Sequence, residues 1–202
     1  MNIKDHARRK PRVHSWATLS NEQISKILSL SERDQLVHDI RDVVLIATGT
    51  GIRAGELRDL QWTDVDLSRR ELTIRSNSGS IRKVPLGDET LGVFEARRAR
   101  QPELELVLGV SPRRVIERVS RKLAVLSKSI GIGSISMYLL RRTFAARLVN
   151  SGANIWSVMG IMGWSMPRSI THGQHSAPGP LVHVAGGIPS DQRNQRIGEK
   201  LY

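Results

Sequence analysis

The stretch ATGTGIRAGELRDLQWTDVD, residues 47–66, decides the fold of this chain. The apolar residues that lead into it follow a helical period, which Gly49 and Gly51 interrupt with a turn. Arg53 then stands at the start of a short helix predicted over residues 54–60. Backbone N–H groups at the start of a helix and a guanidinium can converge on an anion. The stretch therefore predicts a helix, a turn and an anion-binding arginine.

The segments before this stretch predict two helices. Ser20 and Gln23 form a capping-box pattern, and apolar residues repeat at helical spacing after it. Residues 36–47 are apolar on nearly every side in their last turns, which is typical of a helix at the centre of a core. These patterns predict a helical domain that begins near residue 21.

The segments after the stretch predict one small sheet and further helices. We expect a loop at residues 64–66, followed by an antiparallel β-hairpin, because residues 71–75 and 81–85 alternate around a polar turn. Pro112 is expected as a first helical residue and Gly152 as a C-terminal cap. Helical patterns cover residues 88–100, 112–129, 138–150 and 155–162. The fold class is therefore α+β, mostly α, with a small antiparallel hairpin packed on helices.

The composition excludes several classes of protein. The chain has no cysteine, which removes disulfide frameworks and thiolate metal sites. Its longest apolar run, residues 43–47, is far shorter than the roughly 20 residues of a membrane span, and no secretory signal is present. The 31 Lys and Arg outnumber the 19 Asp and Glu, giving a net charge of +12. We expect a soluble intracellular protein with nucleic acid as its first candidate partner, the alternative being a ribosome-associated or merely basic protein.

The composition also suggests how the chain is divided. Residues 1–20 carry five Lys and Arg against one acid and show no helical or strand period, which predicts a basic arm. Residues 21–175 contain the periodic segments and form one predicted domain. Residues 176–202 are rich in Gly, Pro and polar residues, which predicts a tail.

Three later patterns complete a recognisable set. They are RKVPL at residues 82–86, YLLRRTFA at 138–145 and VMGIMGWS at 158–165. Together with TGTGIRAGEL and LQWTDVD in residues 48–66, in this order and spacing, they resemble the catalytic domain of the tyrosine recombinase (phage integrase) family. The resemblance covers roughly residues 18–175.

The resemblance implies a chemistry and a partner. In this family a tyrosine hydroxyl attacks a phosphodiester of double-stranded DNA, two arginines clamp the phosphate, and a lysine protonates the leaving oxygen. The reaction needs no metal or nucleotide cofactor. For this chain the resemblance implies double-stranded DNA as the partner, shared with either further copies of the chain or other recombinase subunits, and no membrane. The implied location is the cytoplasm of a bacterium, in association with the nucleoid. They usually carry a helical core-binding domain ahead of the catalytic domain, and we expect this chain to lack it.

The resemblance carries over to individual residues only in part. Arg53 and Arg141 stand at the two arginine positions, and Trp164 stands at the position of a histidine or tryptophan. Asn77, however, takes the place of the lysine, and Tyr138 takes the place of a histidine. The phosphate clamp is thus expected to be intact, while the groups that move protons are replaced.

The nucleophile position is occupied by Gly173, nine residues beyond Trp164. Because glycine has no side chain that can attack phosphorus, we expect no covalent cleavage of DNA. The alternatives are an unconventional nucleophile, for which Tyr138, Tyr202 and His172 are the candidates, or a non-enzymatic accessory protein or decayed remnant. His172 and the nearby His175 are otherwise expected to be solvated loop residues.

Other basic residues are expected to contact the DNA backbone. Each has a plainer alternative: the helical ones can form solvated faces, Arg53 and Arg141 can form ion pairs with Glu56 and nearby acids, and Trp164 can belong to the core. The expected DNA-binding residues are Arg75, Arg82, Lys83 and Arg142, with some of the helical residues Arg97, Arg98, Arg100, Arg113, Arg114, Arg118, Arg121 and Lys122.

Overall fold

The computed structural model describes residues 18–32, 36–76 and 79–164. Most of the predicted basic arm, the whole tail, and the positions of Asn77 and Gly173 lie outside these residues. So do the other candidates His172, His175 and Tyr202. Within the described ranges, no helix combines the length and the apolar character needed to cross a membrane.

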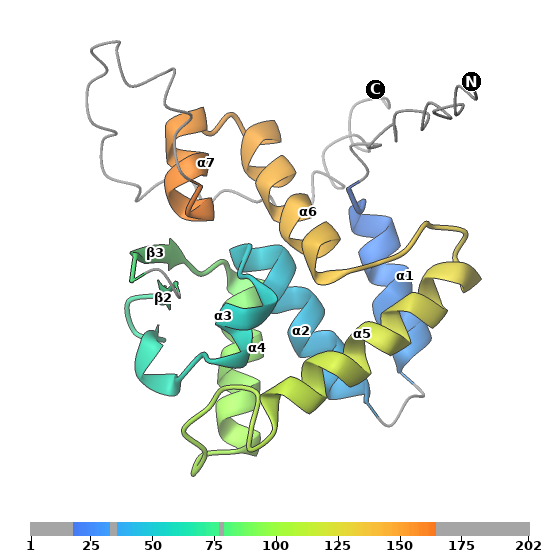
Figure 1. Ribbon diagram of the computed structural model, residues 1–202, viewed down its shortest axis with the longest axis horizontal. Helices are drawn as coiled ribbons and strands as arrows, with labels where there is room; N and C mark the ends of the chain where they lie inside the picture. The colour runs from blue at the N-terminus through green and yellow to red at the C-terminus, as the bar shows by residue number, and fades with distance from the viewer. Residues whose placement is uncertain (1–17, 33–35, 77–78, 165–202) are drawn as a thin grey trace, which may run out of the picture.

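The described chain is mostly helical with one small sheet, which confirms the predicted fold class (Figure 1). The helices are α1 (Asn21–Ser31), α2 (Val37–Thr50), α3 (Ala54–Arg58), α4 (Asp88–Arg100), α5 (Pro112–Ser129), α6 (Met137–Asn150) and α7 (Ile155–Met162), and the sheet and its lead-in are η1 (Trp62–Asp64), β1 (Val65–Asp66), β2 (Glu71–Arg75) and β3 (Ile81–Pro85).

Helix α2 is the centre of the core, as its apolar pattern predicts. Every residue from Asp42 to Thr48 is buried, and α1, α4, α5 and α6 pack around the helix (Figure 1). The helix ends where Gly51 adopts a left-handed conformation with φ of 63°. A Cβ atom at Gly51 would lie 2.5 Å from the ring of Phe144 on α6. The turn of the quoted stretch therefore requires glycine both for its backbone conformation and for the close approach of α6.

The sheet is antiparallel with the strand order β1-β2-β3. Leu72 pairs with Val84 and Ile74 with Arg82, so the predicted hairpin is confirmed and its inner face is defined. The predicted loop at residues 64–66 is wrong in part, because these residues end the 3-10 turn η1 and form β1, whose Val65 pairs with Leu72. A two-residue strand is too short to show the alternation on which strand prediction depends.

Local sequence signals place the helix ends. The Ser20 hydroxyl accepts a hydrogen bond of 3.1 Å from the Gln23 amide, and the Gln23 side chain accepts one of 2.9 Å from the Ser20 amide. The expected capping box is therefore present. Helix α5 begins at Pro112, as predicted, and Gly152 follows α6 with φ of 82°.

Arg97 on α4 is not at the surface. Arg97 is buried, and it donates a hydrogen bond of 2.6 Å to Asp42 and one of 3.3 Å to Asp39, both on α2. Arg100 also reaches Asp42 at 2.6 Å, and Arg118 reaches Asp39 at 3.2 Å. Arg97 therefore forms no solvated face and is not one of the helical residues that can reach DNA, because its charge is neutralised inside the protein between α2 and α4.

Candidate phosphate-binding site

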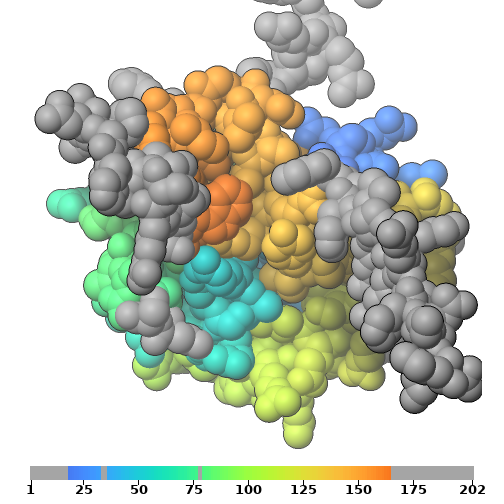
Figure 2. All heavy atoms as spheres, turned by 45° about the horizontal axis from the view of Figure 1, so that its top comes forward, coloured from blue at the N-terminus to red at the C-terminus, as the bar shows by residue number. Residues whose placement is uncertain are grey.

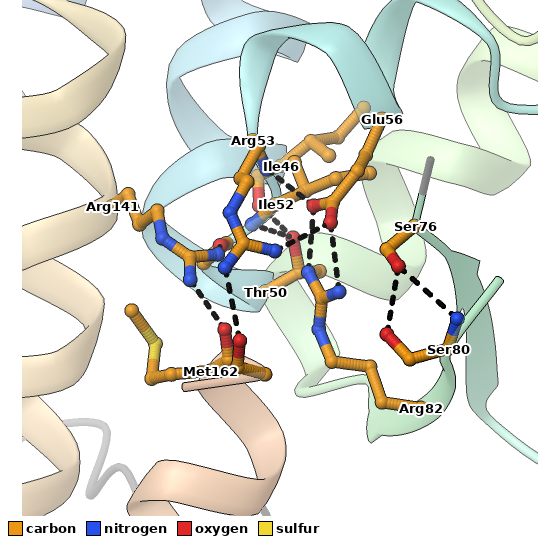
Figure 3. Close-up of polar contacts among 12 residues, drawn as sticks. Ile46, Thr50, Ile52, Arg53, Glu56, Ser76, Ser80, Arg82, Arg141 and Met162 are labelled. Atoms are coloured by element: carbon orange, nitrogen blue, oxygen red, sulfur yellow. Dashed lines mark hydrogen bonds and ion pairs between the residues drawn. The ribbon is translucent and has the colours of Figure 1, made fainter. Parts of the chain in front are cut away.

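Arg53 is held between α3 and the end of α7. It precedes the first residue of α3 in an extended conformation, and 42% of its side chain is exposed. Its guanidinium donates to Glu56 Oε1 at 2.8 Å and to the Gly163 carbonyl at 3.0 Å (Figure 3). Its backbone N–H donates to Glu56 Oε2 at 2.8 Å. The guanidinium, rather than this backbone amide, is therefore the donor that an anion can reach.

Arg141 approaches the same place from α6. Its buried guanidinium donates to the carbonyls of Gly51 and Met162 (Figure 3). Burial lowers the pKa of Arg141 to about 10, and the positive charges of Arg53 and Arg82 contribute to that decrease. The side chain thus links the turn after α2 to the last turn of α7 and carries a cation that its neighbours do not neutralise.

Two further residues belong to the cluster. Glu56 on α3 accepts hydrogen bonds of 2.8 and 2.6 Å from the two terminal nitrogens of Arg82 on β3. These side chains are only 5% and 8% exposed, respectively. Burial alone would raise the pKa of Glu56, but the hydrogen bonds from Arg82 and Arg53 outweigh it and lower the pKa to about 2. Glu56 is therefore an ionised carboxylate shared by two guanidiniums.

Glu56 and Arg82 have other roles than the sequence predicts. Glu56 is predicted only as an alternative surface partner of Arg53, and Arg82 is predicted, with Arg75 and Lys83, as a residue that contacts the DNA backbone. The signal was present, since Arg82 is two residues from the buried Val84 and therefore points to the same face of the strand. The ion pair between Arg53 and Glu56 does form, but Glu56 is buried rather than at the surface.

The end of α7 closes the cluster. Gly163 adopts φ of 58°, and a Cβ atom there would lie 3.3 Å from Cδ of Arg82. Trp164 follows with 44% of its surface exposed, so it does not belong to the core. In the space-filling view the end of α7, in deep orange, lies beside the cyan surface of the α3 region and beside α6 (Figure 2).

The remaining candidates lie around this cluster rather than in it. Tyr138 is 69% exposed in the first turn of α6, and the Arg142 guanidinium lies 5.9 Å from the centre of its ring. Arg75 bonds to Asp64 at 3.0 Å. Lys83 bonds to Glu71 at 2.7 Å on the opposite face of the sheet from Arg82. The structure therefore brings together Arg53, Arg82 and Arg141 beside Trp164, and leaves Arg75 and Lys83 outside.

A cavity beside Glu56 is less suited to a phosphate than the arginine cluster is. A cavity of about 270 Å³ is lined by Glu56, Asp59 and Asp64, among others, but not by any of the three clustered arginines. Its three carboxylates outnumber its one arginine, Arg75, so the charge of the cavity disfavours a phosphate. In the part of the chain that the structure describes, no group of three or more His, Asp or Glu is arranged to hold a metal ion.

Comparison with known proteins identifies the domain. The profile of the Phage integrase family matches residues 17–178, most of the chain. The chain belongs to the phage integrase family. This phage integrase domain is similar to tyrosine recombinase XerC of Roseiflexus castenholzii (23% identical, covering 86% of this chain and 63% of the relative) and to XerD of Neisseria meningitidis serogroup B (30% identical, covering 72% and 53%). It thus spans little more than half of these relatives' lengths.

Solved structures show the same fold. The Tn1549 transposon integrase in complex with transposon right end DNA gives a TM-score of 0.65 at 21% identity, covering 77% of this chain and 60% of that one. The XerA recombinase gives 0.61 at 26% identity, covering 74% and 57%. The lambda integrase catalytic core gives 0.56 at 21% identity, covering 73% of this chain and 91% of that core. The phage integrase domain described here therefore has the tyrosine recombinase catalytic fold.

Proposed function

We propose that this phage integrase domain holds duplex DNA by a backbone phosphate between Arg53 and Arg141 and does not cut it. One observation carries the proposal: the two guanidiniums, which lie far apart in the sequence, meet at the carbonyls of Met162 and Gly163. Arginine is suited to this task because its planar fork binds two phosphate oxygens at once. Arg53 is the exposed arm of the clamp, and Arg141 is the buried one.

Duplex DNA is the partner that the charge and the family support. The chain carries a net charge of +12, and its family acts in DNA recombination. Arg75 and Lys83 on the hairpin and Arg142 on α6 supply further contacts to the DNA backbone in this proposal. A second copy of the chain, or an active recombinase subunit, would share the same DNA.

The residues at the family's nucleophile and lysine positions support the absence of cleavage. Gly173 has no hydroxyl to form a phosphate ester, and the Asn77 amide does not release a proton to a leaving oxygen at neutral pH. Tyr138 replaces a histidine beside the clamp. Holding the phosphate and cutting the strand depend on different residues, so the first function can persist without the second.

One observation favours a second candidate function, cleavage by Tyr138. Its hydroxyl-bearing ring is exposed one helical turn before Arg141, on the same helix. In this alternative Tyr138 attacks the phosphate that the clamp holds. The Tyr138→Phe variant separates the two candidates, because it abolishes cleavage by Tyr138 and leaves the clamp unchanged.

Binding is tested by gel shift of a DNA duplex at increasing salt. We expect a shift that weakens steeply as salt rises, and we expect Arg53→Gln to weaken binding by about tenfold at low salt. Arg69→Gln is the matched control, since it removes the same charge from an exposed arginine that pairs with Asp66 at 3.8 Å. No shift of any duplex at low salt, or equal losses in the two variants, would contradict the proposed clamp.

A further inference from the structure

The arginine cluster contains more positive charge than its carboxylate neutralises. Oε1 of Glu56 accepts from Arg53 and Arg82, and Oε2 accepts from the Arg53 backbone amide and from Arg82. The further acceptors among the described residues are uncharged carbonyls of Gly51, Met162 and Gly163. Three guanidiniums therefore surround one carboxylate, which leaves two positive charges for a ligand.

Arg82 is the residue that raises the net charge of the cluster from +1 to +2. It binds Glu56 through both terminal nitrogens, whereas the Arg53 side chain uses one nitrogen for Glu56 and remains partly exposed (Figure 3). If Arg82 were neutral, Arg53 would be the counter-ion of Glu56, and the cluster would keep one positive charge. Arg82 therefore acts on a ligand indirectly, by satisfying Glu56.

The excess positive charge contributes to the lowered pKa of Arg141 and favours a ligand with more than one negative charge. The pKa of Arg141 is lowered to about 10 by burial and by the repulsion of Arg53 and Arg82. Between buried groups, where the effective dielectric constant is low, each additional opposite charge on a ligand is strongly attracted. An internal phosphodiester carries a single negative charge, while a phosphate monoester carries close to two above its second pKa of about 6.

Building on the proposed clamp, we propose that this site selects a doubly charged phosphate monoester, such as the terminal phosphate of a DNA strand, over an internal phosphodiester. Arg82 is the positioning residue that provides the selectivity through Glu56. A terminal phosphate also offers three free oxygens instead of two to the N–H groups of Arg53 and Arg141. The site thus binds the backbone phosphate of an intact duplex and prefers the end of a broken DNA strand to it.

Nicked duplexes of one sequence test this selectivity. The nick carries a 3′-phosphate, a 5′-phosphate or hydroxyls on both sides, and binding is followed by fluorescence anisotropy. At about pH 7.5 we expect one of the phosphorylated nicks to bind about tenfold more tightly than the hydroxyl nick. At about pH 5.5 the ratio should fall toward one, because the monoester takes up a proton.

The described charged groups of the cluster do not produce that pH dependence. Glu56, with a pKa of about 2, stays ionised throughout, and Arg141, with a pKa of about 10, stays protonated. The ratio between two duplexes also cancels any titration that affects both equally. Among the described residues, the charged and titratable groups that face Arg141 are Arg53 just before α3, Glu56 from α3, Arg82 from β3 and Tyr138 from α6, and α7 contributes none within Ile155–Met162.

Variants of Arg82 and Glu56 test whether Arg82 supplies the second net positive charge of the cluster. Arg82→Gln should lower the ratio to about twofold, and Arg82→Gln combined with Glu56→Gln should restore it, because the double change returns two net positive charges. A purely structural role for Arg82 would not be rescued in this way. Arg69→Gln is again the matched control and should keep the full ratio. If Arg82→Gln alone does not fold, the double variant and the pH dependence of the binding ratio in the native chain still test the proposed selectivity.

The outcomes separate this inference from the proposed function. Equal binding of all nicked duplexes at the higher pH, a ratio that does not change with pH, or a full ratio in Arg82→Gln would overturn the selectivity alone. Binding of no duplex at low salt would overturn both. Inorganic phosphate without DNA is a further arm: if it raises the melting temperature while the duplexes bind equally, the site takes free phosphate and the DNA-end assignment is wrong.

Discussion

Gly163 is the residue at which the arginine cluster and α7 meet. Its φ of 58° and the 3.3 Å spacing between an added Cβ and Arg82 both disfavour a side chain. We expect Gly163→Ala to lower the free energy of unfolding by about 1–2 kcal/mol. Gly160→Ala is the control within the same helix, where a Cβ meets nothing within 4 Å, and we expect it to stabilise the protein by about 0.5–1 kcal/mol. Urea denaturation measures both changes. Equal changes in the free energy of unfolding for the two variants would show that the close approach between residue 163 and Arg82 does not affect stability.

Glu56 should make the stability depend on pH. Its pKa falls from the ordinary 4.5 to about 2 in the folded protein, so its contribution is complete above pH 4.5 and is lost as the pH falls toward 2. We expect the native chain to be more stable than Glu56→Gln at neutral pH, by up to roughly 3 kcal/mol, and this difference to shrink over that interval. Denaturation curves at several pH values measure it. Glu103→Gln, at an exposed carboxylate, should show almost no difference at any pH.

At the scale of elements, α4 is tied to α2 by a buried ion pair. Arg97 and Asp42 are each only 3% exposed in their side chains and lie 2.6 Å apart. We expect Arg97→Met to cost about 3–5 kcal/mol, since it removes one of the partners of a buried carboxylate. Arg97→Met combined with Asp42→Leu should cost less than the sum of the single changes, because no half of the pair is left charged. A double-mutant cycle by chemical denaturation measures this coupling, and additive losses would contradict it.

The elements themselves were largely predictable, while their long-range partners were not. The ends of α1 and α5 follow from Ser20, Gln23 and Pro112, which act within one turn of the helix. The strand β1 was missed because its pairing with β2, rather than its own pattern, defines it. The roles of Arg82 and Arg97 depend on carboxylates that are 26 and 55 residues away in the sequence. Local hydrophobic patterns do not predict contacts between residues so far apart.

The candidate site was predictable to a similar degree. The motif frames placed Arg53, Arg141 and Trp164, which the fold brings to the end of α7. They did not show that Glu56 is buried, nor that it is shared with Arg82, because both facts follow from the packing of β3 against α3 and α7. The sequence therefore indicated the two arginines of the proposed clamp, and the structure adds the carboxylate and the third guanidinium that set the charge around them.

At the scale of the whole molecule, anion binding should stabilise the fold. The net charge of +12 and the buried Arg141 cation both oppose the compact state until an anion neutralises them. We expect duplex DNA to raise the melting temperature of the native chain, and to raise it less in Arg53→Gln than in the Arg69→Gln control. Equal increases in both variants would place the DNA away from the cluster.

The central claim, that this chain holds DNA without cutting it, is tested most directly with a nicked suicide duplex that traps a covalent intermediate. We expect the native chain to retard this duplex in a native gel and to form no SDS-resistant adduct. The chain carrying Gly173→Tyr, Tyr138→His and Asn77→Lys together is the matched comparison, and we expect it to form the adduct because these changes return the family's nucleophile and proton-transferring groups to the proposed clamp. An SDS-resistant adduct with the native chain, lost in Tyr138→Phe, would contradict the account and establish an active enzyme.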